Sequence, residues 1–260
     1  MSQVYRFLGE KRLGLYTPAQ IKYFDRLAVE QLGMEGFALM CEAAAIALQA
    51  TLERWPDIEE IYCLCGKGNN GGDGLVFAAL AARQGIDVHV ALLAQLSDMS
   101  ADALRALSLA ESERVDFLSL DQLEFIPENV VLVDAILGLG QTRPPEDYLL
   151  NLIQLVNQSP NIVVALDVPT GLCGRTGQLL GQEAIKSDLT VTFIAAKRGL
   201  FTELGRVCCP DVVIADLDIP KRVFDQNPSA YLVDDVLMDY WLLPRPSNSH
   251  KGSSGRVAVL

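Results

Sequence analysis

The feature of this sequence that most restricts its fold is the alternation of short apolar runs with helical stretches. The runs with the length and apolar character of buried strands are Ile61–Cys65, Asp87–Leu93, Val130–Val133, Ile162–Leu166, Leu189–Ile194 and Val212–Ala215. Strands of this kind belong to parallel sheets that helices cover on both faces. The sequence therefore predicts a Rossmann-like three-layer α/β/α sandwich with a mostly parallel sheet.

Helices are expected before and between these strands. For the first helix, Thr17 is a suitable N-cap, Pro18 fits the first helical position, and Gly33 ends the apolar periodicity. An alanine-rich helix follows at about Phe37–Glu53. Further helices are expected at about Leu75–Gln84, Ala101–Ala110 and Tyr148–Asn157.

Charge and composition exclude several classes of partner. The 260 residues carry a formal net charge of -12, which repels phosphate backbones and anionic lipid, so we expect neither nucleic acid nor membrane as a partner. No segment is expected to cross a bilayer, and the N-terminus does not resemble a secretory signal. The cysteines lack a CxxC pair and are expected to be buried free thiols in a reducing, cytoplasmic compartment. They are Cys41, Cys63, Cys65, Cys173, Cys208 and Cys209.

A glycine-rich segment, 66–74, lies between a predicted strand and a predicted helix and is expected to form a loop. Glycines let backbone amides approach a phosphate, and Gly66, Gly68 and Gly71 have the spacing of a dinucleotide-binding fingerprint. The alternative is a tight strand-to-helix turn without a ligand. Hydride-transferring dehydrogenases also place an acidic residue at the end of the second strand, whereas Asp87 begins that strand here. This departure disfavours an NAD-dependent oxidoreductase.

Polar side chains follow three of the predicted strands. The carboxyl ends of parallel strands line one crevice, so Asn70, Asp134, Asp167 and Thr170 are expected to converge. Amide, carboxylate and hydroxyl oxygens suit a hard cation. The alternative is that Asn70 and Thr170 only cap turns.

Four segments together resemble a known family. They are the string GNNGGDG at 68–74, VDAILGLG at 133–140, DVPTG at 167–171, and 193–199 with Lys197. In this order they resemble the NAD(P)HX epimerases, the YjeF N-terminal family, over about Thr17–Pro220; that family has serine more often than threonine at the position of Thr170. The resemblance implies epimerisation of the R and S forms of hydrated NADH and NADPH at nicotinamide ring carbon six. This reaction is a metabolite repair that feeds a dehydratase.

The resemblance also implies a site. Potassium would be held by Asn70, Asp134 and Thr170. The implied substrate contacts are Asn69, Asn70, Gly71, Gly72, Asp73, Gly138, Leu139, Gly140, Gln141, Thr142, Arg143, Pro144 and Asp167. Arg143 could meet a phosphate or remain a solvated surface arginine.

Epimerisation at a hemiaminal carbon needs one group that gives and takes a proton at its oxygen. His89 lies inside a predicted strand and His250 in the tail, so neither histidine belongs to a motif. Asp167 is therefore the expected catalytic residue, although it could instead fix a ribose or the loop. Asp73 is expected to cap helix amides, and Lys197 and Arg198 are expected in a solvated turn, which we favour slightly over a phosphate contact.

Residues 1–225 are predicted to form the epimerase domain, 226–248 a linker, and 249–260 the truncated start of an ADP- or ATP-dependent NAD(P)HX dehydratase domain. The tail carries Ser249-His250-Lys251-Gly252, which resembles the opening of that domain in bifunctional Nnr proteins. A homodimer or higher homo-oligomer is expected. The alternative function is a non-catalytic dinucleotide-binding or scaffold module of the same fold.

Removing the residues after Pro246 should leave epimerisation and the melting temperature nearly unchanged, because a lone strand gains little burial without its sheet. Kinetics and thermal unfolding of the shortened chain measure both. A large loss of stability would show instead that the tail packs into the epimerase domain or its dimer interface.

Overall fold

The computed structural model describes residues 13–145, 147–233 and 238. Seven strands form one sheet in the order β4-β3-β2-β5-β6-β7-β8, and every neighbouring pair is parallel. They are β2 (Glu60–Cys65), β3 (Asp87–Leu92), β4 (Val115–Leu118), β5 (Val131–Ala135), β6 (Ile162–Leu166), β7 (Leu189–Phe193) and β8 (Val212–Ala215). The predicted α/β class with a mostly parallel sheet is confirmed.

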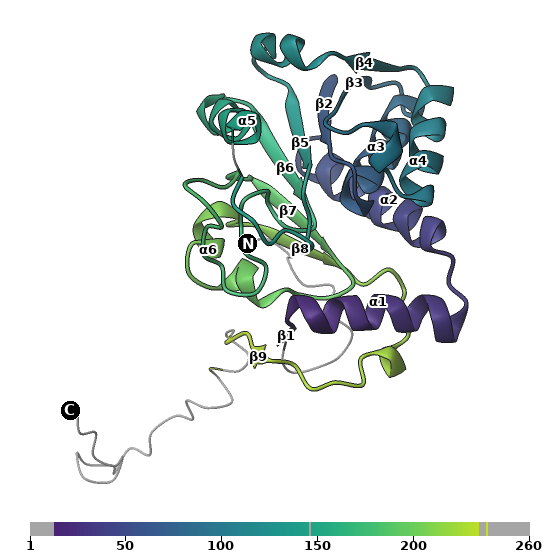
Figure 1. The fold of residues 1–260 in the computed structure, drawn as a ribbon, viewed down its shortest axis with the longest axis vertical. Helices are drawn as coiled ribbons and strands as arrows, with labels where there is room; N and C mark the ends of the chain where they lie inside the picture. Colours follow the sequence, from purple (N-terminus) through teal and green to yellow (C-terminus); the bar gives the residue numbers. More distant parts are fainter. Residues whose placement is uncertain (1–12, 146, 234–237, 239–260) are drawn as a thin grey trace, which may run out of the picture.

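Helices cover both faces of this sheet, as Figure 1 shows for α2, α3 and α4 on one side and α5 on the other. The helices are α1 (Pro18–Leu32), α2 (Gly36–Arg54), α3 (Asn69–Arg83), α4 (Ala101–Ser112), α5 (Asp147–Gln158) and the short α6 (Gly205–Cys208). Ala44, Phe77 and Ala106 belong to the core on the first face, and Ile153 belongs to the core on the second. The arrangement has three layers.

The first helix begins and ends where its sequence indicates. The Thr17 hydroxyl accepts a hydrogen bond from the Gln20 backbone amide, and the Gln20 side-chain oxygen accepts one from the Thr17 backbone amide. Gly33 ends the helix with φ 67°. A left-handed residue at this position favours glycine because a side chain there would be strained. The predicted caps are confirmed.

Helix α2 corrects the expectation that no segment has the character of a membrane span. Within the described residues it is the one helix long and apolar enough by length and composition. A core helix passes the same test, and α2 buries Leu39, Ala43, Ala47 and Leu48, among others, in the core shared with α3. Its packing accounts for its apolar character.

The glycine-rich segment is shorter as a loop than predicted, because α3 begins at Asn69 rather than near Leu75. The glycines serve close packing here, and none of those between 66 and 74 has a positive φ. A Cβ on Gly66 would lie 2.0 Å from the Ile136 carbonyl oxygen, and one on Gly71 would lie 1.8 Å from the Gly66 carbonyl oxygen. The first turn of α3 therefore packs directly on the chain that leaves β2.

A second, two-stranded sheet joins the two ends of the described chain, where the sequence indicated no strand. Strand β1 (Gly14–Leu15) pairs antiparallel with β9 (Ala230–Tyr231), so the first residues after 225 lie against the domain (Figure 1). The domain boundaries at 225 and 248 stay predictions. The predicted dehydratase start, 249–260, lies outside the described residues.

Gly71→Ala should lower the free energy of unfolding by about 1–3 kcal/mol, the usual cost of overpacking. The added methyl group would collide with backbone atoms, which cannot rotate away as a side chain can. Gly68→Ala is the matched control. No atom lies within 4 Å of the Cβ it would add, and we expect a loss below about 1 kcal/mol. Urea unfolding of both variants measures the difference, and equal stabilities would contradict the packing role of Gly71.

Candidate active site

The strand order reverses between β2 and β5, where ligands of open parallel sheets bind. The chain leaves β2 toward β3 on one side and leaves β5 toward β6 on the other. The two strand ends are tied together because the Gly66 amide donates to the Ala135 carbonyl at 3.0 Å. The crevice is therefore expected beside the segments that follow Cys65 and Ala135.

Three consecutive residues after β5, Leu137 to Leu139, bring the predicted site residues together. The Leu137 amide donates to the Thr170 hydroxyl at 3.1 Å, and the Leu139 amide donates to Asp167 Oδ2 at 2.8 Å. A Cβ on Gly138 would lie 2.9 Å from Asp167 Oδ2 and 3.1 Å from Asn70 Cγ. The expected convergence of the three motifs is thus seen in the structure.

Asp134 is almost fully buried and bound to Thr170. Its Oδ1 accepts the Thr170 hydroxyl at 2.7 Å, its Oδ2 accepts the Thr170 amide at 2.7 Å, and Oδ1 also accepts the Ile136 amide at 3.2 Å. Burial raises the pKa of Asp134 to about 6, and the hydrogen bonds from Thr170 and Ile136 oppose that rise.

Asn70 is buried, and neither its Oδ1 nor its Nδ2 has a hydrogen-bond partner among the described residues. It caps no turn, since the N-cap of α3 is Gly68 and no side chain bonds there. The capping alternative is therefore wrong for Asn70. A buried carboxamide without partners is costly, which makes this side chain a candidate for binding a ligand.

Lys197 overturns the expectation of a solvated turn. Its side chain is fully buried, and its Nζ lies 2.6 Å from Asp167 Oδ1 and donates to the Phe193 carbonyl at 2.5 Å. Burial lowers the pKa of Lys197, and the carboxylates of Asp167, Asp73 and Asp25 oppose that shift. Asp167 itself keeps 14% of its side chain exposed, so a ligand can reach it.

Asp73 lies in the second turn of α3 rather than at a helix start, so the expectation that it caps helix amides is wrong. Its side chain is buried. Burial raises the pKa of Asp73 well above its ordinary range, the charge of Asp167 raises it further, and Lys197 lowers it. Asp73 and Asp167 therefore lie close enough in one site for the charge of each to act on the other.

The remaining predicted contacts differ in their surroundings. Gln141 joins the second loop to the third, because its Nε2 donates to the Pro169 carbonyl and its Oε1 accepts the Gly171 amide. Asn69 is exposed and accepts the Ser100 hydroxyl, while Gly71 and Gly72 are buried inside α3. The exposed residues of the second loop are Gly140, Thr142, Arg143 and Pro144. Their roles as substrate contacts stay predictions.

The histidine and cysteines of the described chain lie outside this site. His89 stacks on Tyr62 with ring centroids 4.5 Å apart, and its Nε2 lies 3.1 Å from Glu60 Oε1. The cysteines are free thiols, four of them buried, and no cluster of His, Cys, Asp and Glu in the described ranges has a metal-binding arrangement.

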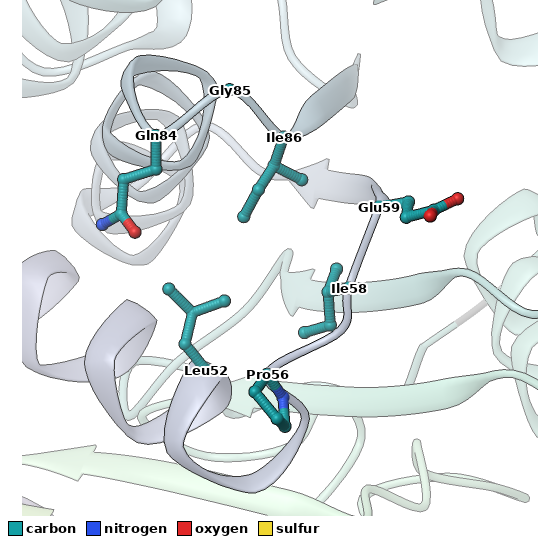
Figure 2. Close-up of a pocket in the computed structure, with 7 residues that line it drawn as sticks. All are labelled: Leu52, Pro56, Ile58, Glu59, Gln84, Gly85 and Ile86. Carbon is teal, nitrogen blue, oxygen red and sulfur yellow. The ribbon is translucent and has the colours of Figure 1, made fainter.

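A pocket lies at the opposite edge of the sheet, where α2 and α3 end and β2 and β3 begin. Figure 2 shows Leu52, Ile58 and Ile86 pointing toward its centre, while the Glu59 carboxylate points outward. The pocket lining includes one charged side chain, Glu59, and one amide side chain, Gln84. It therefore lacks the chemistry gathered at the carboxyl edge.

Comparisons with known proteins agree with the motif pattern. Residues 36–199 match the family described as YjeF-related protein N-terminus. The chain is 39% identical over 254 residues to the bifunctional NAD(P)H-hydrate repair enzyme Nnr of Coxiella burnetii, covering 95% of this chain and 50% of that protein. It is 33% identical over 200 residues to the NAD(P)H-hydrate epimerase of Limosilactobacillus fermentum, covering 77% of this chain and 95% of that protein.

The fold has a solved counterpart. The crystal structure of yeast ynu0 superimposes with a TM-score of 0.72 at 22% identity, covering 86% of this chain and 98% of the yeast chain. At this identity the likeness shows a shared fold. The chain spans about half the length of the bifunctional relatives that it matches.

Thr170→Val should destabilise the fold more at pH 8 than at pH 5, because it removes the hydroxyl that donates to Asp134. A carboxyl whose folded pKa is raised to about 6 contributes stability at low pH that is lost as the pH rises through that value. Without the Thr170 hydroxyl, the pKa of Asp134 in the folded state rises further, so more stability is lost as the pH increases. Urea unfolding in potassium-free buffer at the two pH values measures it.

Thr170→Ser is the control, because it keeps the hydroxyl and deletes only a methyl group. Its cost should be about 0.5–1.5 kcal/mol and the same at both pH values. A valine variant with equal losses at pH 5 and pH 8 would contradict the assigned role of the hydroxyl.

Proposed function

This chain belongs to the family described as YjeF-related protein N-terminus, and we propose that it is an isomerase that interconverts the R and S forms of hydrated NADH and NADPH. The observation that carries the proposal is Asp167. It stands at the carboxyl end of β6, partly exposed, beside the second loop and close to the strand-order reversal. Relatives over most of this chain are named NAD(P)H-hydrate epimerase.

The reaction needs proton transfer at one carbon substituent. Ring carbon six of the hydrated nicotinamide carries a hydroxyl beside the ring nitrogen, so it can lose that hydroxyl as water or open to an aldehyde before re-forming with either hand. Asp167 accepts the proton from this hydroxyl and returns it, or protonates it as it leaves. Its carboxylate is held by Lys197 and Leu139 on separate oxygens, which fixes its orientation toward the crevice.

The dinucleotide phosphates need a local anion site on this acidic protein. The first amides of α3, at Asn69, Asn70 and Gly71, precede the first intrahelical bond, which runs from the Gly72 amide to the Gly68 carbonyl. Free amides and the helix dipole favour a phosphate there. The exposed Arg143 on the second loop can supply a bidentate contact to the same phosphates.

We propose further that a potassium ion binds at Asn70, Asp134 and Thr170. The unpartnered Asn70 carboxamide fits this assignment, because a cation on Oδ1 removes one unsatisfied buried group. The oxygens of Asp134 and Thr170 are of the hard type that such an ion prefers. The bound ion supplies positive charge that offsets the phosphates of the substrate.

We propose that the protein acts in the cytoplasm as a homo-oligomer and that an ADP- or ATP-dependent dehydratase consumes its product. The names of the bifunctional relatives support a repair role.

Asp167→Asn should lower kcat for interconversion of the NADHX epimers by about a hundred- to ten-thousand-fold. The variant should still fold and bind the dinucleotide, at a lower melting temperature because the buried Lys197 loses its charged partner. Chromatographic separation of the epimers over time measures the rate, and NADH oxidation is followed in parallel. Asp57→Asn, the same change in an exposed turn, is the control and should keep full activity. Near-normal turnover of Asp167→Asn would remove Asp167 from the mechanism.

Potassium should raise the melting temperature relative to choline at equal ionic strength. A ligand tenfold above its Kd stabilises the folded state by about 1.4 kcal/mol. Asn70→Leu should abolish the difference, because it removes the unpartnered oxygen while keeping a side chain of similar size. Equal melting of the wild-type chain in both salts would refute the ion site.

A further inference from the structure

Strands β6 and β7 are neighbours, and both end in the same unusual backbone turn. Asp167 has φ 66° and Ile194 has φ 70°. In each case the next amide bonds back across the turn, from Val168 to the Leu166 carbonyl at 2.9 Å and from Ala195 to the Phe193 carbonyl at 2.8 Å. Such γ-turns with positive φ are rare and strained, above all for a β-branched residue. Residues held this way persist only where their surroundings fix them, and they cluster at active sites.

One buried ammonium group joins these two turns. Lys197 Nζ donates to the Phe193 carbonyl, which opens the second turn, and lies 2.6 Å from Asp167 Oδ1 at the centre of the first. The backbone beside Lys197 is fixed in turn by Tyr16, whose carbonyl accepts the Arg198 amide at 3.0 Å and whose amide donates to Ala196 at 2.8 Å. Because Lys197 is fully buried, it acts on a substrate only through Asp167.

We propose that Lys197 is a positioning residue for the epimerisation proposed above. It holds the Asp167 carboxylate in one orientation through Oδ1, while the Leu139 amide holds Oδ2. A carboxylate oxygen has a further lone pair after accepting one such bond. Asp167 therefore keeps acceptor capacity beyond these two contacts, with its side chain fixed in place for proton transfer.

The charges around this pair require a cation at Lys197. Asp25 on α1, Asp73 on α3 and Asp167 all act on the Lys197 ammonium. In the described part of the chain, Lys197 is the cation that lowers the pKa of both Asp73 and Asp25, so its removal would leave these carboxyls and Asp167 without that charge. Removing one partner of a buried ion pair leaves an uncompensated charge, whereas removing both does not. Each single variant should therefore lower the melting temperature, whereas the double variant should recover part of that loss.

The test compares Lys197→Met, Asp167→Asn and the double variant with the wild-type chain. Lys197→Met should lower kcat by about a hundredfold or more, within the range of lost acid–base catalysis, with KM within about threefold of the wild-type value. The double variant should be as slow as Asp167→Asn alone, since Lys197 acts through Asp167. Its melting temperature should exceed that of Lys197→Met.

Lys197→Gln covers the case in which Lys197→Met does not fold, because it keeps a hydrogen-bond donor while it loses the charge and one atom of chain length. It should show the same loss of kcat at nearly constant KM. An unchanged kcat in either folded variant, or a double variant slower than Asp167→Asn by the full effect of Lys197→Met, would overturn the proposal.

Failure of the positioning role of Lys197 can be distinguished from failure of the proposed function. A wild-type chain that does not interconvert the NADHX epimers refutes the epimerase assignment. The melting temperatures of the four proteins then still report whether Lys197 and Asp167 are coupled, and additive changes would refute the pairing itself.

Discussion

The site depends on one interaction, the buried ion pair between Lys197 and Asp167. A lysine without exposed surface is stable only when a charge and further acceptors replace water, and here Asp167 and the Phe193 carbonyl do so. The pair bridges the ends of β6 and β7, each of which closes in a strained turn. A rigid carboxylate results at the edge of the sheet where ligands of this architecture bind.

The second constraint is close backbone packing where the strand order reverses. Glycines at 66 and 71 let the chain after β2, the chain after β5 and the first turn of α3 approach more closely than side chains permit. Leu137 to Leu139 then lie within reach of Thr170, Asn70 and Asp167. The close packing of these segments therefore also brings the polar groups of the site together.

Much of this could be predicted from the sequence, because local signals and tertiary structure agree. The Thr17 hydroxyl caps the start of α1, Gly33 ends the helix in a left-handed conformation that glycine adopts without strain, and the apolar runs form strands of a parallel sheet. The prediction of a loop over the whole glycine-rich segment was wrong because glycine favours loops in isolation. Here the absence of a side chain lets the first turn of α3 pack directly on the backbone after β2. The prediction that Lys197 lies in a solvated turn was wrong because it followed the general rule that lysine is rarely buried. The signal that could have found it is its place among apolar residues just past β7, at the carboxyl edge that also carries Asp167.

A crystal structure of the chain with bound NADHX, grown in potassium, tests the central claim most directly. The account predicts the nicotinamide ring with the hydroxyl of carbon six within about 3.2 Å of an Asp167 oxygen, a hydrogen-bond distance. It also predicts the pyrophosphate at the first amides of α3. A dinucleotide bound with its ring away from Asp167, or at another edge of the sheet, would contradict the account.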